Sequence, residues 1–184
     1  CVTQPSPPDL SGLIKAYDVR GVVPDPFSPE VARAIGAAFA DVVVLPDGGR
    51  SMVIGTDMRP SGPELVDAFA AGLTARGVDV VLIGLCSTDG LYHASGALDV
   101  PGAMFTASHN PAEYNGIKLC RAGARPVGQE TGLGEIKDLL VDGVPAYDGE
   151  PGEITDRDVL SGYAEFLRGL VDLTAGRKLT VAVD

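Results

Sequence analysis

The sequence has no Trp and few aromatic residues, which make up only 5% of the chain, although 45% of its residues are hydrophobic. So high an apolar content excludes a disordered chain. The hydrophobic residues are mainly small, and abundant Ala, Gly and Val suit helices that pack closely on a sheet. At 184 residues, the chain is long enough for one well-cored domain and the start of another.

Cysteine is also scarce. Cys1, Cys86 and Cys120 are too few and too far apart for a disulfide framework, and none has the C-x-x-C spacing of a zinc or redox site. The longest apolar runs, such as "VDVVLIGLC", fall far short of the ~20 residues that span a bilayer. Residues 1–10 lack the basic-then-apolar order of a signal peptide, so we predict a flexible leader there. These absences favour a cytoplasmic location without a membrane partner.

Positive charge is in short supply, because 14 Lys and Arg residues face 25 Asp and Glu residues, for a net charge of −11. This balance excludes broad binding to nucleic acid or to anionic membranes, whose phosphates would be repelled. The nucleotide-binding patterns G-x-x-x-x-G-K-[ST] and G-x-G-x-x-G do not occur either. A phosphate-bearing partner must therefore be small and must meet a local cationic site.

Helix and strand patterns alternate in the first half of the chain. A helical repeat of apolar residues predicts a helix over 29–44, which Ser28 can cap. Residues 51–57 have the composition of a short buried strand, and residues 61–77 predict a second helix.

The second of these helices carries its own start and stop signals. Ser61 and Glu64 have the spacing of a capping box. Gly77 stands where a residue in the left-handed conformation would end the helix. The apolar face between these signals consists of Leu65, Phe69, Gly72 and Leu73.

The alternation continues in the following segments. Continuous β-branched residues over 78–84 predict a buried strand, residues 89–97 a short helix and residues 103–106 another strand. Residues 116–127 have the pattern of a hairpin that turns at Ala122-Gly123. The alternation indicates an α/β fold, and the hairpin makes its sheet mixed.

The composition changes beyond Leu140, where Gly, Pro and acidic residues predict a connection. A helix is predicted over 156–171, and residues 178–184 have the pattern of a strand that has only begun. We therefore expect one domain over 11–145, followed at 146–184 by a linker, a connecting helix and the first strand of a second, similar domain.

The stretch "FTASHNPAEYNGIK", from Phe105 to Lys118, allows two interpretations. A Ser in a polar loop is ordinarily a turn residue or a cap. However, this loop follows a strand, where α/β sheets bind their ligands, His109 adjoins Ser108, and Lys118 returns on the next strand. These features favour a loop that carries a reacting serine. No G-x-S-x-G pattern occurs, so a serine hydrolase of that kind is a poor fit.

Three other segments have structural explanations when each is taken alone. His93 has no partner near it in the sequence and is interpreted as structural. In "GTDMRPSG", Asp57 and Arg59 can pair while Ser61 caps the helix. The pentapeptide "YDVRG", from Tyr17 to Gly21, is equally consistent with a buried ion pair and with a ligand site.

Taken together, "YDVRG", "GTDMRPSGPEL" and "TASHNPAEYNGIK" occur in the order and at the spacing of the α-D-phosphohexomutase family. From about Leu10 to Val183 the sequence resembles the first domain of the phosphomannomutase/phosphoglucomutase branch of this family. The resemblance implies a three-layer α/β/α domain around a mixed, mostly parallel four-stranded sheet. It also implies that Ser108 carries a phosphoryl group.

The resemblance implies a phosphotransfer reaction between hexose 6-phosphate and hexose 1-phosphate through a 1,6-bisphosphate intermediate. A phosphoserine carries about −1.5 to −2 charge, so it needs local cations, and Arg20 and Lys118 are suitable by residue type. His109 either orients the loop or moves the proton. Asn110 contacts the substrate or fixes the turn, and Tyr17 borders the sugar.

The same resemblance implies Mg²⁺, held in part by a phosphoryl oxygen on Ser108. Its protein ligands in the family are Asp residues of a D-G-D-x-D-R loop in the second domain, which this sequence does not contain. The expected partners are mannose or glucose phosphates, a hexose 1,6-bisphosphate as activator, and the remaining domains of the same enzyme. We therefore expect the chain alone to be nearly inactive. The alternative is a stand-alone α/β domain that binds sugar phosphates or regulates without catalysis.

Overall fold

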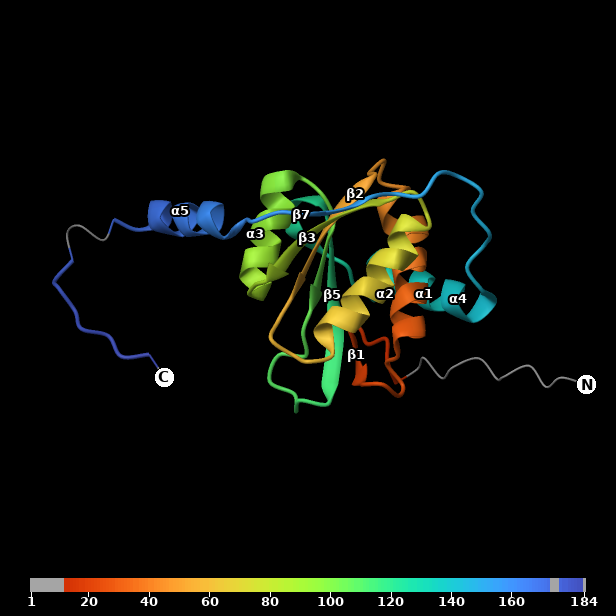
Figure 1. Ribbon diagram of the computed structural model, residues 1–184, viewed down its shortest axis with the longest axis horizontal. Coiled ribbons are helices and arrows are strands. Elements are labelled where there is room, and N and C mark those ends of the chain that lie inside the picture. Colours follow the sequence, from red (N-terminus) through yellow and green to blue (C-terminus); the bar gives the residue numbers. More distant parts are fainter. Residues whose placement is uncertain (1–11, 173–175, 184) are drawn as a thin grey trace, which may run out of the picture.

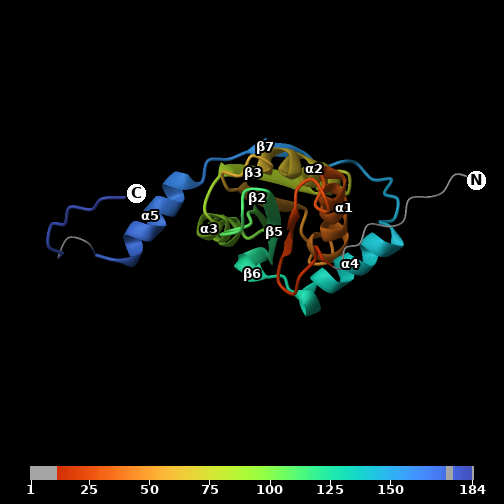
Figure 2. The same ribbon diagram turned by 90° about the horizontal axis from the view of Figure 1, so that it is seen from below.

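The computed structural model describes residues 12–172 and 176–183. Seven strands form one mixed sheet in the order β1-β5-β4-β2-β3-β7, and β6 pairs with β5. Figure 1 and Figure 2 show this sheet with helices on both of its faces. The strands are β1 (Val19–Val22), β2 (Ser51–Thr56), β3 (Asp79–Leu85), β4 (Gly102–Phe105), β5 (Tyr114–Arg121), β6 (Arg125–Pro126) and β7 (Ile154–Asp156).

The expectation of a four-stranded sheet was wrong, because three short strands extend it. Two of them, β1 and β7, lie at the two edges of the sheet. All three residues of β7 are exposed, so this strand has no apolar pattern and is held by main-chain pairing with β3. The mixed, mostly parallel character is confirmed: β4, β2, β3 and β7 are parallel to one another, while β5 is antiparallel to β1, β4 and β6.

The helices form the two outer layers of the expected three-layer domain. Alternate residues of β2 point to opposite faces: Met52 and Ile54 belong to one apolar cluster, with residues of α1, α2 and α4, whereas Val53 belongs to a second cluster, with residues of α3. Figure 2 shows α3 on the side of the sheet away from α1 and α4. The helices are α1 (Pro29–Phe39), α2 (Gly62–Thr74), α3 (Thr88–Leu98), α4 (Leu133–Asp142) and α5 (Leu160–Leu170).

Helices α1 and α2 approach each other through two glycines. A Cβ atom at Gly36 would lie 2.2 Å from the carbonyl oxygen of Phe69, and one at Gly72 would lie 2.1 Å from that of Arg33. Such contacts are shorter than any side-chain carbon can make, so each glycine is required by the neighbouring helix backbone. Close approach of these helices buries Ile35 and Phe69 completely.

Several local sequence signals are confirmed. Ser28 caps α1, since its Oγ accepts a hydrogen bond from the backbone N–H of Val31 at 3.3 Å. The predicted helix over 29–44 is continuous, although its last turn, Ala40–Val44, is a π-helix. Gly77 has the left-handed φ of +74° that was expected at the end of α2, and Gly123 turns the β5–β6 hairpin with a φ of +71°.

The predicted capping box at the start of α2 was wrong. Ser61 has helical backbone angles, and its side chain makes no capping hydrogen bond. Its Oγ instead accepts a hydrogen bond from Nδ2 of Asn115 at 2.9 Å. The Ser61 hydroxyl group thus binds a residue that is distant in the sequence, and it does not cap the helix, although its spacing from Glu64 had predicted that it would.

The segment after Leu140 was predicted in part. Helix α5 forms within the expected 156–171 range, and Figure 1 shows it extending away from the sheet beside α3. The strand predicted over 178–184 was wrong: residues 176–183 contain no strand, and Leu179, Val181 and Val183 are 66–92% exposed. Without a neighbouring strand to complete its hydrogen bonds, an extended apolar segment does not become a strand. The described residues therefore show no beginning of a second domain.

Two further expectations concern the leader at the start of the chain and membrane-spanning segments. The leader predicted over residues 1–10 lies outside the described residues. Within the described ranges, no helix is both long enough and apolar enough to cross a bilayer.

Candidate active site

The loop between β4 and β5 presents Ser108 at the surface. Ser108 and His109 are exposed, although Thr106 and Ala107 just before them are buried. Ser108 has a left-handed φ of +53°, which is uncommon for a residue with a side chain. Its N–H donates to Oγ1 of Thr106 at 2.9 Å, and the N–H of Asn110 donates to the carbonyl oxygen of Ala107 at 3.0 Å. These bonds define a tight turn with the serine at its outer edge.

Two cations reach this end of the sheet from neighbouring strands. Arg20 on β1 is opposite Gly116 on β5, and Lys118 stands two residues farther along β5. Because side chains two residues apart share a face of a sheet, Arg20 and Lys118 project from the same side. Sheet pairing thus places together two residues that are almost 100 positions apart in the sequence.

A hydrogen bond connects Arg20 to the serine loop, and Asp18 links Arg20 with Lys118. Arg20 donates from Nη1 to Oδ1 of Asn110 at 2.7 Å and from Nη2 to Oδ2 of Asp18 at 2.6 Å. The same Asp18 oxygen lies 3.9 Å from Nζ of Lys118. One carboxylate therefore faces two cations, and the group keeps a net positive charge on a chain that is strongly acidic overall.

Arg20 also has an unused donor. Its Nε is buried and makes no hydrogen bond within the described part of the chain. A buried N–H without a partner is costly, so a ligand oxygen at this position would be stabilised. We call the group formed by Asp18, Arg20, Asn110 and Lys118 the cationic cluster.

Two of the residues nominated from the sequence stand apart from the cationic cluster. His109 follows Ser108 and is exposed. Tyr17 is 81% exposed, and its side chain lines a separate cavity of about 430 Å³ with Pro126, Gln129 and Thr131. The structure thus joins Arg20 to Asn110 directly and to Lys118 through Asp18, and places Ser108 two residues before Asn110, whereas Tyr17 is not brought to them. The roles of these residues stay predictions.

The ion pair between Asp18 and Arg20, one of the two interpretations of "YDVRG", is present at 2.6 Å. The approach of Asp18 to Lys118 and the loop contacts of Arg59 were not predicted from the sequence. Asp18 stands two residues before Arg20 in "YDVRG", and that spacing on an extended segment was the available signal. The predicted pairing of Arg59 with Asp57 is confirmed, with 3.3 Å between Nε and Oδ2. However, Arg59 donates four further hydrogen bonds, all to carbonyl oxygens of residues 108–114. These bonds had no sequence signal, because Arg59 and the acceptor residues are distant from each other in the chain.

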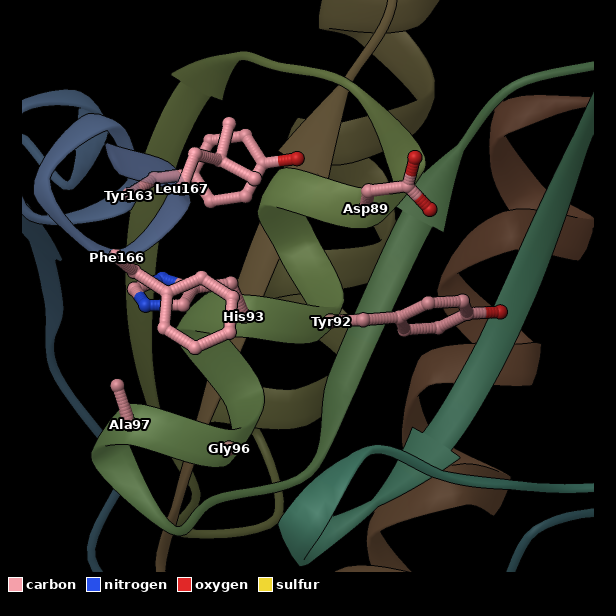
Figure 3. Close-up of a pocket in the computed structure, with 8 residues that line it drawn as sticks. All are labelled: Asp89, Tyr92, His93, Gly96, Ala97, Tyr163, Phe166 and Leu167. Atoms are coloured by element: carbon pink, nitrogen blue, oxygen red, sulfur yellow. The ribbon is translucent and has the colours of Figure 1, made fainter. Parts of the chain in front are cut away.

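His93 lies far from this loop, between α3 and α5. Its ring centroid is 5.3 Å from that of Tyr163 and 4.8 Å from that of Phe166, and Figure 3 shows Phe166 placed against the imidazole. These rings line a largely apolar cavity of about 660 Å³. The contacts agree with the structural interpretation of His93.

The described cysteines are unsuited to nucleophilic chemistry. Burial raises the pKa of the Cys86 thiol and that of the Cys120 thiol, so both remain protonated at neutral pH. The exposed hydroxyl of Ser108 is therefore the better placed nucleophile.

The described residues contain no group of three or more His, Cys, Asp or Glu side chains that could hold a metal ion. Mg²⁺ prefers several oxygen ligands in an octahedral arrangement. By themselves, these residues do not form the magnesium site that the resemblance implies.

Comparison with known proteins identifies the family of the chain. A family profile described as phosphoglucomutase/phosphomannomutase, alpha/beta/alpha domain I, matches residues 11–141. "Phosphohexose mutases" of Xanthomonas campestris pv. campestris are 41% identical over 172 residues, which is 92% of this chain and 37% of theirs. A phosphomannomutase of Escherichia coli is 38% identical over 162 residues, which is 86% of this chain and 35% of that protein.

A solved structure shares the fold as well. The crystal structure of a phosphoglucomutase/phosphomannomutase family protein from Burkholderia thailandensis superposes with a TM-score of 0.78 at 36% sequence identity, over 88% of this chain and 36% of that one. The chain thus spans little more than a third of the length of these relatives. On the strength of the profile match and the shared fold, the chain belongs to the phosphoglucomutase/phosphomannomutase family, where it corresponds to domain I.

Proposed function

We propose that this chain is the phosphoserine-bearing domain of an enzyme that interconverts hexose 6-phosphate and hexose 1-phosphate through a hexose 1,6-bisphosphate. The observation that carries this proposal is the exposed Ser108 hydroxyl on a tight turn that Asn110 joins to Arg20. Membership of the family supports the reaction class. The specific substrates, mannose or glucose phosphates, are part of the proposal.

The reaction proposed for Ser108 consists of two transfers. In the first, a free sugar hydroxyl attacks the phosphorus of phospho-Ser108, a P–O bond to the sugar forms, and the P–Oγ bond to the serine breaks. The hydroxyl proton leaves to a base. In the second, the serine oxygen attacks the phosphorus of the other phosphate, a P–Oγ bond forms, and the P–O bond between that phosphate and the sugar breaks. The sugar oxygen takes a proton back from the base, so the phosphoserine forms again and a hexose monophosphate leaves.

The cationic cluster has the properties that these transfers need. Phosphoryl transfer depends mostly on in-line positioning and on neutralising charge. Arg20 can make a forked contact with two phosphoryl oxygens, whereas Lys118 supplies a point charge that can follow the bridging oxygen as it leaves. The partnered carboxylate of Asp18 holds both cations until the phosphoryl group competes for them.

The other nominated residues have supporting roles in this proposal. Asn110 joins the loop to Arg20 and so positions the serine relative to the cations. His109 orients the loop or accepts the hydroxyl proton. Tyr17, which is exposed and lines a separate cavity, would border the sugar.

The proposed cofactor and partners involve groups that the described residues do not contain. We propose that Mg²⁺ binds a phosphoryl oxygen on Ser108 and that a hexose 1,6-bisphosphate activates the serine. Because this chain matches only 37% and 35% of the length of two relatives, we also propose that further domains supply the metal ligands and the sugar contacts. The chain alone should therefore show little turnover. A cytoplasmic location belongs to the same proposal.

Phosphorylation of Ser108 tests the function directly. The protein is expressed from its complete reading frame, incubated with glucose 1,6-bisphosphate or mannose 1,6-bisphosphate, and measured by intact mass and peptide mapping. We expect one phosphate on Ser108 and loss of mutase turnover in Ser108→Ala. A Ser87→Ala variant, which removes another Ser that follows a strand, serves as control and should keep activity.

A domain that binds sugar phosphates without catalysis is the second candidate. The cationic cluster favours it, because Arg20 and Lys118 could hold a phosphate without any transfer. In that case the protein binds hexose bisphosphate but acquires no covalent phosphate, and Ser108→Ala leaves binding unchanged. That pair of results would reject the mutase assignment.

A further inference from the structure

Arg59 is a buried cation outside the cationic cluster. It lies in the turn between β2 and α2, and its side chain is 9% exposed. Figure 1 shows this turn and the serine loop at the same end of the sheet. A buried charge is costly unless it is paired and hydrogen-bonded, and Asp57 supplies the paired charge at 3.3 Å.

The guanidinium group of Arg59 binds four carbonyl oxygens of the serine loop. Nη1 donates to Pro111 at 2.6 Å and to Tyr114 at 2.8 Å. Nη2 donates to Ser108 at 3.0 Å and to Asn110 at 2.7 Å. A planar guanidinium can direct donors toward several acceptors at once, whereas a Lys ammonium places three donors on one atom. Arginine therefore fits this position in a way that lysine does not.

These hydrogen bonds act on a strained segment. A residue with a side chain that is held at φ of +53°, as Ser108 is, persists only where its surroundings determine the conformation. Thr106 Oγ1 fixes the N–H of Ser108, and Arg59 fixes its carbonyl group. Both sides of the strained residue are thus held.

A second contact connects the same turn with the end of the loop. Nδ2 of the fully buried Asn115 donates to Oγ of Ser61 at 2.9 Å. Its Oδ1 accepts from the N–H of Gly116 at 2.8 Å. The segment from Asp57 to Ser61 therefore holds the loop through Arg59 and the start of β5 through Ser61.

We propose that Arg59 is a positioning residue, which fixes the serine loop so that the Ser108 hydroxyl faces the cationic cluster. This inference rests on the proposed function for its catalytic consequence. Arg59 contacts no reacting atom: its charge is paired with Asp57 and its four Nη bonds go to main-chain carbonyl groups. Its effect on the reaction is to set the distance and angle at which Ser108 meets a sugar phosphate.

The test compares Arg59→Lys and Arg59→Ala with the matched variants Arg76→Lys and Arg76→Ala, in protein expressed from its complete reading frame. Arg76 is buried to the same degree, at 9% exposed, and pairs with Asp41 away from the serine loop. Hydrogen exchange of the amides of residues 106–116 reports loop order. Steady-state kinetics with hexose phosphate report kcat and KM separately.

We expect both Arg59 variants to exchange faster in residues 106–116 and to lose kcat by about 100-fold, as a misplaced reacting group does, with a smaller change in KM. Millimolar guanidinium should restore part of the lost kcat of Arg59→Ala. The Arg76 variants should keep loop exchange and kcat, and guanidinium should not raise their activity. If Arg59→Ala fails to fold, Arg59→Lys carries the same comparison.

The proposal is overturned if loop exchange is unchanged in Arg59→Lys, or if kcat falls equally in the Arg59 and Arg76 variants. Failure of the proposed function would give a result that can be told apart from failure of this proposal about Arg59. If the unmodified protein forms no phosphoserine and has no mutase turnover, the function fails, while faster loop exchange in Arg59→Lys alone still establishes that Arg59 holds the loop.

Discussion

Asp18 shows how a single carboxylate could control the proposed phosphate site. It accepts a hydrogen bond from Arg20 at 2.6 Å and lies 3.9 Å from the Lys118 ammonium, so it offsets part of the charge that would attract a phosphoryl group. The same carboxylate holds the Arg20 guanidinium group, which also contacts Asn110 of the serine loop, and the Lys118 ammonium near each other. Orientation and charge thus act in opposite directions on phosphate affinity.

We expect Asp18→Asn to bind glucose 1,6-bisphosphate about fivefold more tightly, because the amide can still accept from Arg20 but no longer carries negative charge. Such a gain corresponds to about 1 kcal/mol for a partly exposed ion pair, and it should shrink at high salt. Calorimetric titration at two salt concentrations measures it. Asp89→Asn, an exposed change on α3, is the control, and equal or weaker binding by Asp18→Asn would contradict the expectation.

The strain at Ser108 can be measured without any substrate. Its φ of +53° costs about 1 kcal/mol for a residue with a Cβ atom but little for glycine. Ser108→Gly should therefore have a free energy of unfolding about 1 kcal/mol higher than Ser108→Ala in urea titrations. At Asp138, an exposed position within α4, the order should reverse, because alanine is the better helix former. The same order at both positions would show that Ser108 is not strained.

At the scale of elements, the order of helices and strands was largely predictable from the sequence. Apolar periodicity located α1, α2 and β2, since each of them buries a continuous face. Both edge strands were missed. Strand β1 alternates buried and partly buried residues but is only four residues long, whereas β7 is exposed throughout and is held by main-chain pairing with β3.

The same distinction, between local sequence patterns and contacts with distant residues, applies to the candidate site. The serine loop and its cations could be nominated from the sequence because they lie in recognisable motifs. The link between Arg20 and Lys118 through Asp18 could not be predicted in this way. The contacts of Arg59 with residues more than 45 positions away could not be predicted either. The capping box failed for the same reason: Asn115, 54 positions from Ser61, takes its hydroxyl.

The contact between α1 and α2 predicts an asymmetry between two glycines. A methyl group at Gly72 would lie 2.1 Å from a backbone oxygen of α1, so the helices would have to separate. Gly72→Ala should therefore lower the free energy of unfolding by about 1–3 kcal/mol. At Gly96 in α3 no atom lies within 4 Å of such a methyl group, so Gly96→Ala should be neutral or stabilise by up to about 1 kcal/mol. Equal effects in thermal or urea unfolding would refute this account of the packing.

At the scale of the whole molecule, the segment after α4 returns across the domain and completes the sheet. The N–H of Gly152 donates to Thr74, that of Val80 to Glu153, and that of Arg157 to Leu82, each to a carbonyl oxygen at 2.7–2.9 Å. Tyr147 also packs on the Arg76 guanidinium, 5.0 Å from its ring centroid. This segment covers an edge of β3 that would otherwise be free to pair with other chains.

We therefore expect a chain that ends at residue 145 to be less stable than one that ends at residue 158. The three main-chain hydrogen bonds named above, at roughly 1 kcal/mol each, give a difference of at least about 3 kcal/mol in the free energy of unfolding, to which the β3–β7 ladder adds. Urea unfolding of the two lengths measures it, and light scattering should detect association of the shorter one. Identical midpoints would show that β7 contributes nothing to the stability of the sheet.

The order of the strands also places the proposed phosphoserine toward one margin of the sheet. Arg20 lies on β1, at that margin, whereas the described polypeptide beyond α4 joins the opposite margin through β7. In the described ranges no residue after α4 pairs with β1, and the turn around Ser108 is exposed to solvent. The margin formed by β1 is therefore left uncovered by that segment, and under the proposed function it is the side from which a sugar phosphate would approach.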